Sequence, residues 1–212
     1  MILSLLFTDP LIFFAIFLAL VVAISIHEFS HVFAAWSMGD DTGASLGRLT
    51  INPLAHLDLW GTLAMLLIGF GWGKPAPYNP NNLRDRKWGE TKVALAGPIS
   101  NLILLVFFVI VYKFLINYTS LGAENLLIQF LFYLIIININ LIIFNLIPLP
   151  PLDGSKVLLD LLRSPRFDKF RFLLETRGPA ILFFLIILDS LSSYSILGHI
   201  FNFVYFSVLK LL

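Results

Sequence analysis

The stretch from Leu11 to Trp36 reads LIFFAIFLALVVAISIHEFSHVFAAW, and it decides both the fold and the chemistry of this chain. A helix over these residues is about 39 Å long at 1.5 Å per residue, which is enough to cross a bilayer. Pro10 suits the first turn of such a helix, and Gly39 followed by Asp40 predicts its end. The sequence therefore predicts a transmembrane helix with ionisable side chains in its C-terminal half.

The polar cluster in this helix is His27-Glu28-Phe29-Ser30-His31. His27 and His31 are four residues apart and therefore lie on one helical face. Two imidazoles at this spacing can hold one zinc ion, while Glu28 between them can act as a base on a water molecule. Because an ionisable cluster inside a hydrophobic span is energetically costly, it indicates a functional site.

The composition is that of a polytopic membrane protein. Of the 212 residues, 58% are hydrophobic and 13% are charged, whereas soluble domains carry about 25% charged residues. The net charge of +1 and the lack of a long basic run exclude a nucleic-acid surface, so the lipid bilayer is the expected environment. Because the chain has no cysteine, nitrogen and oxygen atoms must hold the zinc.

Further apolar stretches complete an all-α fold with a core of three transmembrane helices. The second span is predicted from Val93 to near Phe114, and the third from near Asn125 to Ile147. Residues 179–212 are apolar again and predict one or two additional C-terminal helices.

The segment between the first two spans predicts an insertion. Residues 42–58 are polar, contain glycine and proline, and predict short strands. Residues 59–73 are too short to cross comfortably and end in glycines, so we expect a re-entrant segment. We expect one membrane-embedded peptidase domain over residues 1–212, with its core at residues 10–160.

Basic residues predict the orientation. The loops 74–92 and 154–178 are rich in Lys and Arg, whereas the connection 114–125 has none. The positive-inside rule therefore places both basic loops in the cytosol. With 59–73 re-entrant, the first helix runs inward, and the histidine pair lies in its cytosolic half. We expect a multi-pass protein of the cell membrane with its site toward the cytosol.

A catalytic zinc needs three protein ligands, and Asp153 is the candidate for the third. It follows the rigid Pro-rich turn 148–152 at the cytosolic end of the third helix. An Asp-Gly pair is also a common turn, and the depth that Asp153 shares with the histidines favours the ligand role. Asn145 has two interpretations: it offers an amide N–H to a reacting oxyanion, or it caps or cross-links helices.

Four other polar residues are expected to be structural. Asn138 and Asn140, in the third span, predict contacts between helices. His56 lies in the loop 52–58, which contains Pro53, and a structural role is favoured over metal binding. His199 is isolated in the last apolar segment and is interpreted in the same way.

The two main motifs resemble those of the site-2 protease family of intramembrane zinc metalloproteases. Residues 27–31 match its H-E-x-x-H motif, and residues 145–154 match N-x-x-P-x-P-x-x-D-G. The G-K-P-x-P at 73–77 and the G-P-x-x-N at 97–101 are similar to the compact prokaryotic branch, and neither a PDZ nor a CBS module is seen. The resemblance covers roughly residues 10–160.

This resemblance implies one zinc ion per chain, held by His27, His31 and Asp153, with Glu28 and Asn145 as catalytic residues. It also implies an endopeptidase that cleaves single-span membrane proteins near the cytosolic side, and it leaves room for a regulatory membrane partner. The alternative hypothesis is a membrane metal transporter or a catalytically silent scaffold that uses the same His/Asp site. A transporter needs a second polar cluster across the bilayer, whereas the outer halves of these helices are almost wholly apolar.

Overall fold

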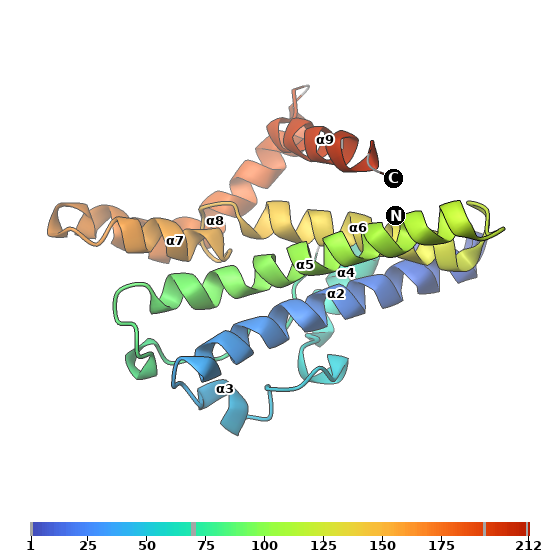
Figure 1. Cartoon of the computed structure of the whole chain (residues 1–212). Helices are drawn as coiled ribbons and strands as arrows, with labels where there is room; N and C mark the ends of the chain where they lie inside the picture. Colours follow the sequence, from blue (N-terminus) through green and yellow to red (C-terminus); the bar gives the residue numbers. More distant parts are fainter. Residues whose placement is uncertain (1, 69–70, 193, 211) are drawn as a thin grey trace.

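The structure is a computed structural model that describes residues 2–68, 71–192, 194–210 and 212. Three long helices form its centre: α2 (Pro10–Ser37), α5 (Gly89–Tyr118) and α6 (Leu126–Asn145). Each is long and apolar enough to cross a membrane, and they pack side by side (Figure 1). The protein therefore has the predicted all-α architecture with a three-helix transmembrane core.

Shorter elements connect and flank the three central helices. They are α1 (Ile2–Thr8), α3 (Thr42–Ser45), η1 (Pro53–Ala55), α4 (Leu59–Ile68), η2 (Pro80–Asn82), α7 (Gly154–Leu161), η3 (Pro165–Phe167), α8 (Asp168–Leu191) and α9 (Ile196–Leu209). The helices α8 and α9 are the predicted C-terminal helices. They add a fourth crossing if this bent pair acts as a single span.

Local sequence signals set the ends of α2. The Asp9 side chain caps the helix by accepting a hydrogen bond from Ile12 N at 3.1 Å, and Pro10 occupies the first turn. At the other end, Gly39 has a φ of 98°, a left-handed conformation that glycine adopts without strain. The helix is one residue longer at each end than predicted.

The insertion between α2 and α5 contains less extended structure than expected. In the described part of the chain, the backbone forms one isolated antiparallel β-bridge, between Leu57 and Gly73. The helices α3 and η1 lie where short strands were expected at 42–58, and Asn52 caps η1 by accepting a 3.1 Å bond from Leu54 N. Within the predicted re-entrant segment, residues 69–70 lie outside the described residues.

Small side chains allow the central helices to pack closely. Ala19 and Ala23 of α2 are fully buried and form a cluster with Leu131 and Leu134 of α6. Because lipid tails are as apolar as these side chains, close backbone approach rather than exclusion of water stabilises such contacts. This packing brings the C-terminal half of α2 against both α5 and α6.

The helix α8 begins earlier than predicted. Residues 168–178, expected to be part of a basic loop, form its first turns. Gly178 in this part of α8 packs directly on Pro150, since a Cβ built on Gly178 would lie 2.8 Å from two Pro150 ring atoms. The helix is therefore in contact with the turn that precedes Asp153.

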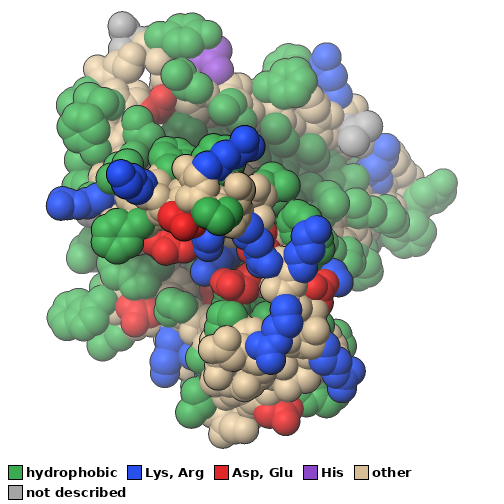
Figure 2. Space-filling view, turned by 90° about the vertical axis from the view of Figure 1, so that its left-hand side faces the viewer, with side chains coloured by type: hydrophobic (Ala, Val, Ile, Leu, Met, Phe, Trp, Pro, Cys, Tyr) green, Lys and Arg blue, Asp and Glu red, His purple; other side chains and the backbone are tan. Residues whose placement is uncertain are grey.

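Asp40 joins the loops at the charged end of the bundle. It is 1% exposed and accepts hydrogen bonds from Thr42 Oγ1 at 2.6 Å, Asn79 N at 2.8 Å and Asn82 Nδ2 at 2.9 Å. These bonds connect the end of α2 to η2. Figure 2 views this end of the molecule and shows Lys, Arg, Asp and Glu side chains gathered on it.

Replacing Asp40 with Ala should lower the temperature of thermal unfolding. The change leaves the Asn79 N–H without this partner in a half-buried position, at a cost of about 1–3 kcal/mol. Asp41→Ala is the control, because Asp41 is exposed and its side chain makes no capping bond. Unfolding midpoints that are the same for both variants in detergent solution would contradict the structural role of Asp40.

Candidate active site

Two segments that are far apart in the sequence meet at the C-terminal half of α2. His27 Nε2 and His31 Nε2 lie 3.2 Å and 3.3 Å from Asp153 Oδ2, which comes from the turn before α7. Both imidazoles are buried, and one ligand atom from each of the three residues lies within 4.8 Å of the others. The structure thus brings together the three residues that the sequence assigned to one metal site.

Hydrogen bonds on the far side of each imidazole determine which ring nitrogen faces Asp153. His27 Nδ1 is 2.6 Å from Asn101 Oδ1, and His31 Nδ1 is 2.8 Å from Val93 O. Both partners are carbonyl oxygens, which only accept, so each neutral ring carries its proton on Nδ1. The lone pairs of both Nε2 atoms then face Asp153 Oδ2.

A second buried amide fixes the orientation of Asn101. Asn101 Nδ2 donates to Asn138 Oδ1 at 2.8 Å, and Asn138 Nδ2 donates to Leu134 O at 2.7 Å. Because Leu134 O is a backbone acceptor, the direction of every bond in this chain of amides is set. We call the pair Asn101–Asn138 the amide relay. It confirms the predicted interhelical contact of Asn138 and holds His27 from α5 and α6.

The residues present fit a zinc ion. When both histidines are neutral, three electron-pair donors converge here, and the buried Asp153 Oδ2 has no hydrogen-bond partner among the described residues. In a tetrahedral site, nitrogen and oxygen ligands about 2.0–2.1 Å from zinc lie about 3.3 Å from one another. The distances from the two histidines to Asp153, 3.2 Å and 3.3 Å, agree with this value.

Gly97 of α5 provides the space beside the histidine pair. A Cβ built at this position would lie 2.5 Å from His31 Nε2 and 2.6 Å from His27 Cε1. Any side chain here would collide with the imidazoles. The segment Gly97–Asn101 therefore makes two contributions: a glycine that admits both rings, and the asparagine that orients one of them. Neither role was assigned to this segment from the sequence.

The three residues line a cavity of about 780 Å³. Glu28 and Asn145 line the same cavity, so all five predicted site residues share it. One wall is apolar and belongs to α8, which contributes Pro179, Leu182, Phe183 and Ile186.

Three polar side chains that contact one another lie on another side of the cavity. Lys156 Nζ of α7 pairs with Glu90 Oε2 of α5 at 3.1 Å, and the Tyr78 hydroxyl donates to the same oxygen at 3.4 Å. Burial raises the pKa of Tyr78, so this residue is a neutral phenol at neutral pH. The ion pair fixes α7, the helix that directly follows Asp153, to α5.

Asn145 remains compatible with both of its sequence interpretations. Its Nδ2 donates to Leu141 O at 3.0 Å, a bond within α6. An amide nitrogen carries two N–H groups, and this bond uses one of them. The role toward an oxyanion stays a prediction.

The two other histidines that were expected to be structural make local contacts. His56 is fully buried, and its Nε2 donates to Thr50 O at 2.6 Å. His199 Nδ1 donates to Ser195 O at 2.6 Å within α9. Neither belongs to the metal-ligand group found among the described residues.

Two further polar contacts tie peripheral helices to the core. Tyr205 of α9 donates to Asn140 of α6, which confirms the interhelical contact predicted for Asn140. Asp160 of α7 accepts from Thr91 Oγ1 at 2.5 Å and pairs with Arg163 at 2.7 Å. Sequence reasoning did not single out Asp160 as structural, because nothing in the local pattern places it opposite α5.

The fold and the site define a membrane protein in which two histidines and one aspartate are placed so that they could hold a metal ion. The family model "Peptidase family M50" matches residues 113–185. "Putative zinc metalloprotease YwhC" of Bacillus subtilis is 42% identical over 147 residues, which are 68% of this chain and 67% of that protein. "Putative zinc metalloprotease Rip2" of Mycobacterium tuberculosis is 30% identical over 158 residues, 71% of this chain and 60% of that protein. The chain belongs to peptidase family M50, the site-2 protease family.

The relatives extend beyond the region they share with this chain. The matched part covers 60% of the Mycobacterium tuberculosis protein and 58% of the Mycolicibacterium smegmatis protein of the same name. No solved structure matches the chain. The activity, substrates and partners of the whole protein are therefore matters for proposal.

Replacing Asn101 with Leu should weaken zinc binding roughly 10–100-fold, because His27 loses the acceptor that fixes its tautomer and ring orientation. Chelator competition on the purified protein measures the affinity. Asn140→Leu is the matched control, since it removes an asparagine bonded to Tyr205 and not to an imidazole. Zinc affinities that are equal in the two variants would contradict the role of the amide relay.

Proposed function

We propose that the chain is an intramembrane zinc metalloendopeptidase that hydrolyses peptide bonds in transmembrane segments of membrane proteins near the cytosolic side. Membership in family M50 and the names of the relatives support zinc peptidase chemistry. The observation that carries the proposal is the convergence of His27, His31 and Asp153 on a cavity in a transmembrane bundle. In this proposal residues 1–212 form one peptidase domain and bind one zinc ion.

The chain's own residues would divide the work of hydrolysis. Zinc, when bound by the two histidines and Asp153, supplies a Lewis acid that polarises the scissile carbonyl. Glu28 lines the cavity but does not belong to the ligand group. It accepts a proton from the attacking water and then donates this proton to the leaving amine. The second N–H of the Asn145 amide donates to the oxygen that becomes negative.

The location of the site supports cleavage toward the cytosol. The C-terminal half of α2 lies toward the left-hand end of the bundle in Figure 1, and Figure 2 shows that charged side chains gather at this end. The positive-inside rule places the basic loops of this end in the cytosol of a multi-pass cell-membrane protein. Tyr78 and Lys156, which contact Glu90, line the same cavity, and in this proposal water reaches the site along these polar side chains.

The substrates proposed are single-span membrane proteins. A helix in lipid has its backbone groups paired internally, so it must unwind before a carbonyl reaches the site. Residues 71–77 are largely without regular structure, and five of them line the cavity together with Glu28, namely Gly71, Trp72, Gly73, Pro75 and Ala76. We infer that this segment pairs with the unwound strand by edge addition. A membrane partner that controls access is a further part of this proposal.

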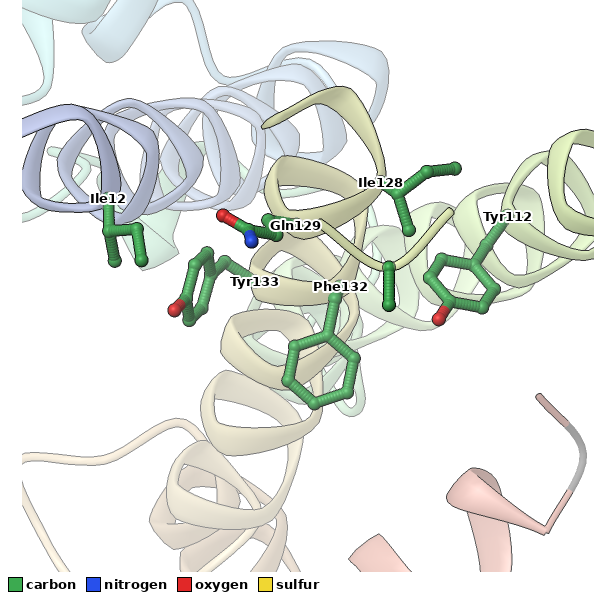
Figure 3. Close-up of a pocket in the computed structure, with 7 residues that line it drawn as sticks. Ile12, Tyr112, Ile128, Gln129, Phe132 and Tyr133 are labelled. Carbon is green, nitrogen blue, oxygen red and sulfur yellow. The ribbon is translucent and has the colours of Figure 1, made fainter. Parts of the chain in front are cut away.

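A second pocket bears on the transporter alternative. It has a volume of about 280 Å³ and lies between the outer parts of α2, α5 and α6. Figure 3 shows its lining, in which Gln129, Tyr112 and Tyr133 are the polar side chains. These amide and phenol groups are poor ligands for zinc, so the described lining does not form the second cation site that a transporter needs. A peptidase is therefore favoured.

Glu28→Gln should abolish cleavage of a single-span substrate in reconstituted vesicles while zinc stays bound. The amide keeps the volume of the side chain but cannot accept the proton, and no metal ligand is lost. Glu124→Gln is the matched control, because Glu124 is exposed and distant in sequence from the site residues. A zinc-free Glu28→Gln protein would contradict the assigned role, and zinc flux that survives this change would favour a transporter.

Asp153→Asn should lower both zinc content and cleavage, because the neutral amide replaces the anionic ligand while volume is preserved. Metal analysis of the purified variant beside wild type provides the measurement. Asp168→Asn serves as control, since Asp168 is exposed at the start of α8. If the Asp153 variant held a full complement of zinc, the third ligand would have to lie elsewhere.

A further inference from the structure

Arg48 is a buried cation that the proposed chemistry does not use. Its side chain lies just beyond α3 and is 5% exposed. Nη2 donates to Lys74 O at 2.6 Å, while the buried Nε has no hydrogen-bond partner in the described part of the chain. None of the ion pairs between described residues includes Arg48. A buried charge without a close counter-ion is costly, so its presence requires an explanation.

The Arg48 bond completes a clamp on one short segment. Lys74 N donates to His56 O at 2.7 Å, and Lys74 O accepts from Arg48. The preceding residue, Gly73, forms the bridge to Leu57. Both backbone groups of Lys74 are therefore held by the insertion between α2 and α4. We call Gly73–Lys74 the clamped segment.

Glu28 approaches the same clamped segment. A Cβ built on Gly73 would lie 3.5 Å from Glu28 Oε1 and 3.0 Å from Ile24 Cγ2. The backbone held by Arg48 is thus in near contact with the α2 face that carries the proposed base. Burial lowers the pKa of the Arg48 guanidinium, and the Glu28 carboxylate opposes this effect. No direct ion pair joins the two groups among the described residues, so the Glu28 carboxylate favours the charged form of Arg48 from across the clamped segment.

We propose that Arg48 is a positioning residue for Glu28, acting by its charge and by holding the clamped segment against the carboxylate. This inference rests on the proposed function, in which Glu28 is the base. Arg48 is not among the described residues that line the cavity, so it acts through Glu28 rather than on the substrate. It holds the carboxylate in one place, as an efficient base requires.

Two substitutions separate the charge of Arg48 from its hydrogen bond. Both Lys and Gln can donate to Lys74 O, but only Lys carries a positive charge. We expect Arg48→Gln to lower kcat about ten- to a hundredfold with KM nearly unchanged, and Arg48→Lys to retain most of kcat. Zinc content should equal that of wild type in both variants. Arg86→Gln and Arg86→Lys are controls at an exposed arginine and should leave kcat unchanged.

A double-mutant cycle tests the coupling without using activity. Unfolding midpoints are measured for wild type, Arg48→Gln, Glu28→Gln and the double variant. If the two charges stabilise each other, Arg48→Gln lowers the midpoint less in the Glu28→Gln background than in wild type. The control cycle pairs Arg86→Gln with Glu28→Gln and should be additive.

The outcomes distinguish this inference from the proposed function. If wild type cleaves no substrate but the cycle shows coupling, the proposed activity fails and the Arg48–Glu28 interaction stands. If wild type is active and the Lys and Gln variants of Arg48 have equal kcat, or if the midpoints are additive, the positioning role is overturned. Should Arg48→Gln fail to fold, the kcat of Arg48→Lys is the test: retention of most of kcat supports the positioning role, and a loss of ten- to a hundredfold overturns it.

Discussion

A transmembrane bundle offers no water to its buried polar groups, and the rest of this structure depends on how that constraint is met. The amide relay meets it at the centre, because Leu134 O, Asn138, Asn101 and His27 pair with one another in one direction. The His27–Asn101 bond joins α2 to α5, and the Asn101–Asn138 bond joins α5 to α6. The contacts that hold the three helices together are therefore also the contacts that orient a metal ligand. Packing and chemistry cannot be altered separately at this point.

Much of the site could be predicted because its signals are local. The spacing of His27 and His31 places both rings on one face whatever the helix packs against. Asp153 required a second argument, since its Asp-Gly context is common in turns. Its depth in the membrane, derived from Lys and Arg counts, linked it to the histidines. The spans were predictable for a similar reason, since length and hydropathy are properties of the segment itself.

The features that escaped prediction are those that arise only when distant segments pack. Nothing near Arg48 in the sequence indicates that its guanidinium is buried against Lys74 O. The structural role of Asp160 likewise depends on a hydrogen bond from Thr91 on another helix. The start of α8 was misplaced because residues 168–178 are charged, and charge was taken as a loop signal although these residues form helical turns. At 42–58, where strands were expected, the chain forms the short helices α3 and η1, and the Asn52 side chain caps η1.

The contact between Gly178 and Pro150 has a consequence for how the site responds to its contents. Gly178 is followed in α8 by the residues that wall the cavity, and Pro150 belongs to the rigid turn that leads into Asp153. The α8 wall of the cavity and the turn that carries the third candidate ligand thus meet at the contact between Gly178 and the Pro150 ring. By thermodynamic reciprocity, if a displacement of α8 changes metal affinity, metal binding must favour one position of α8 to the same extent.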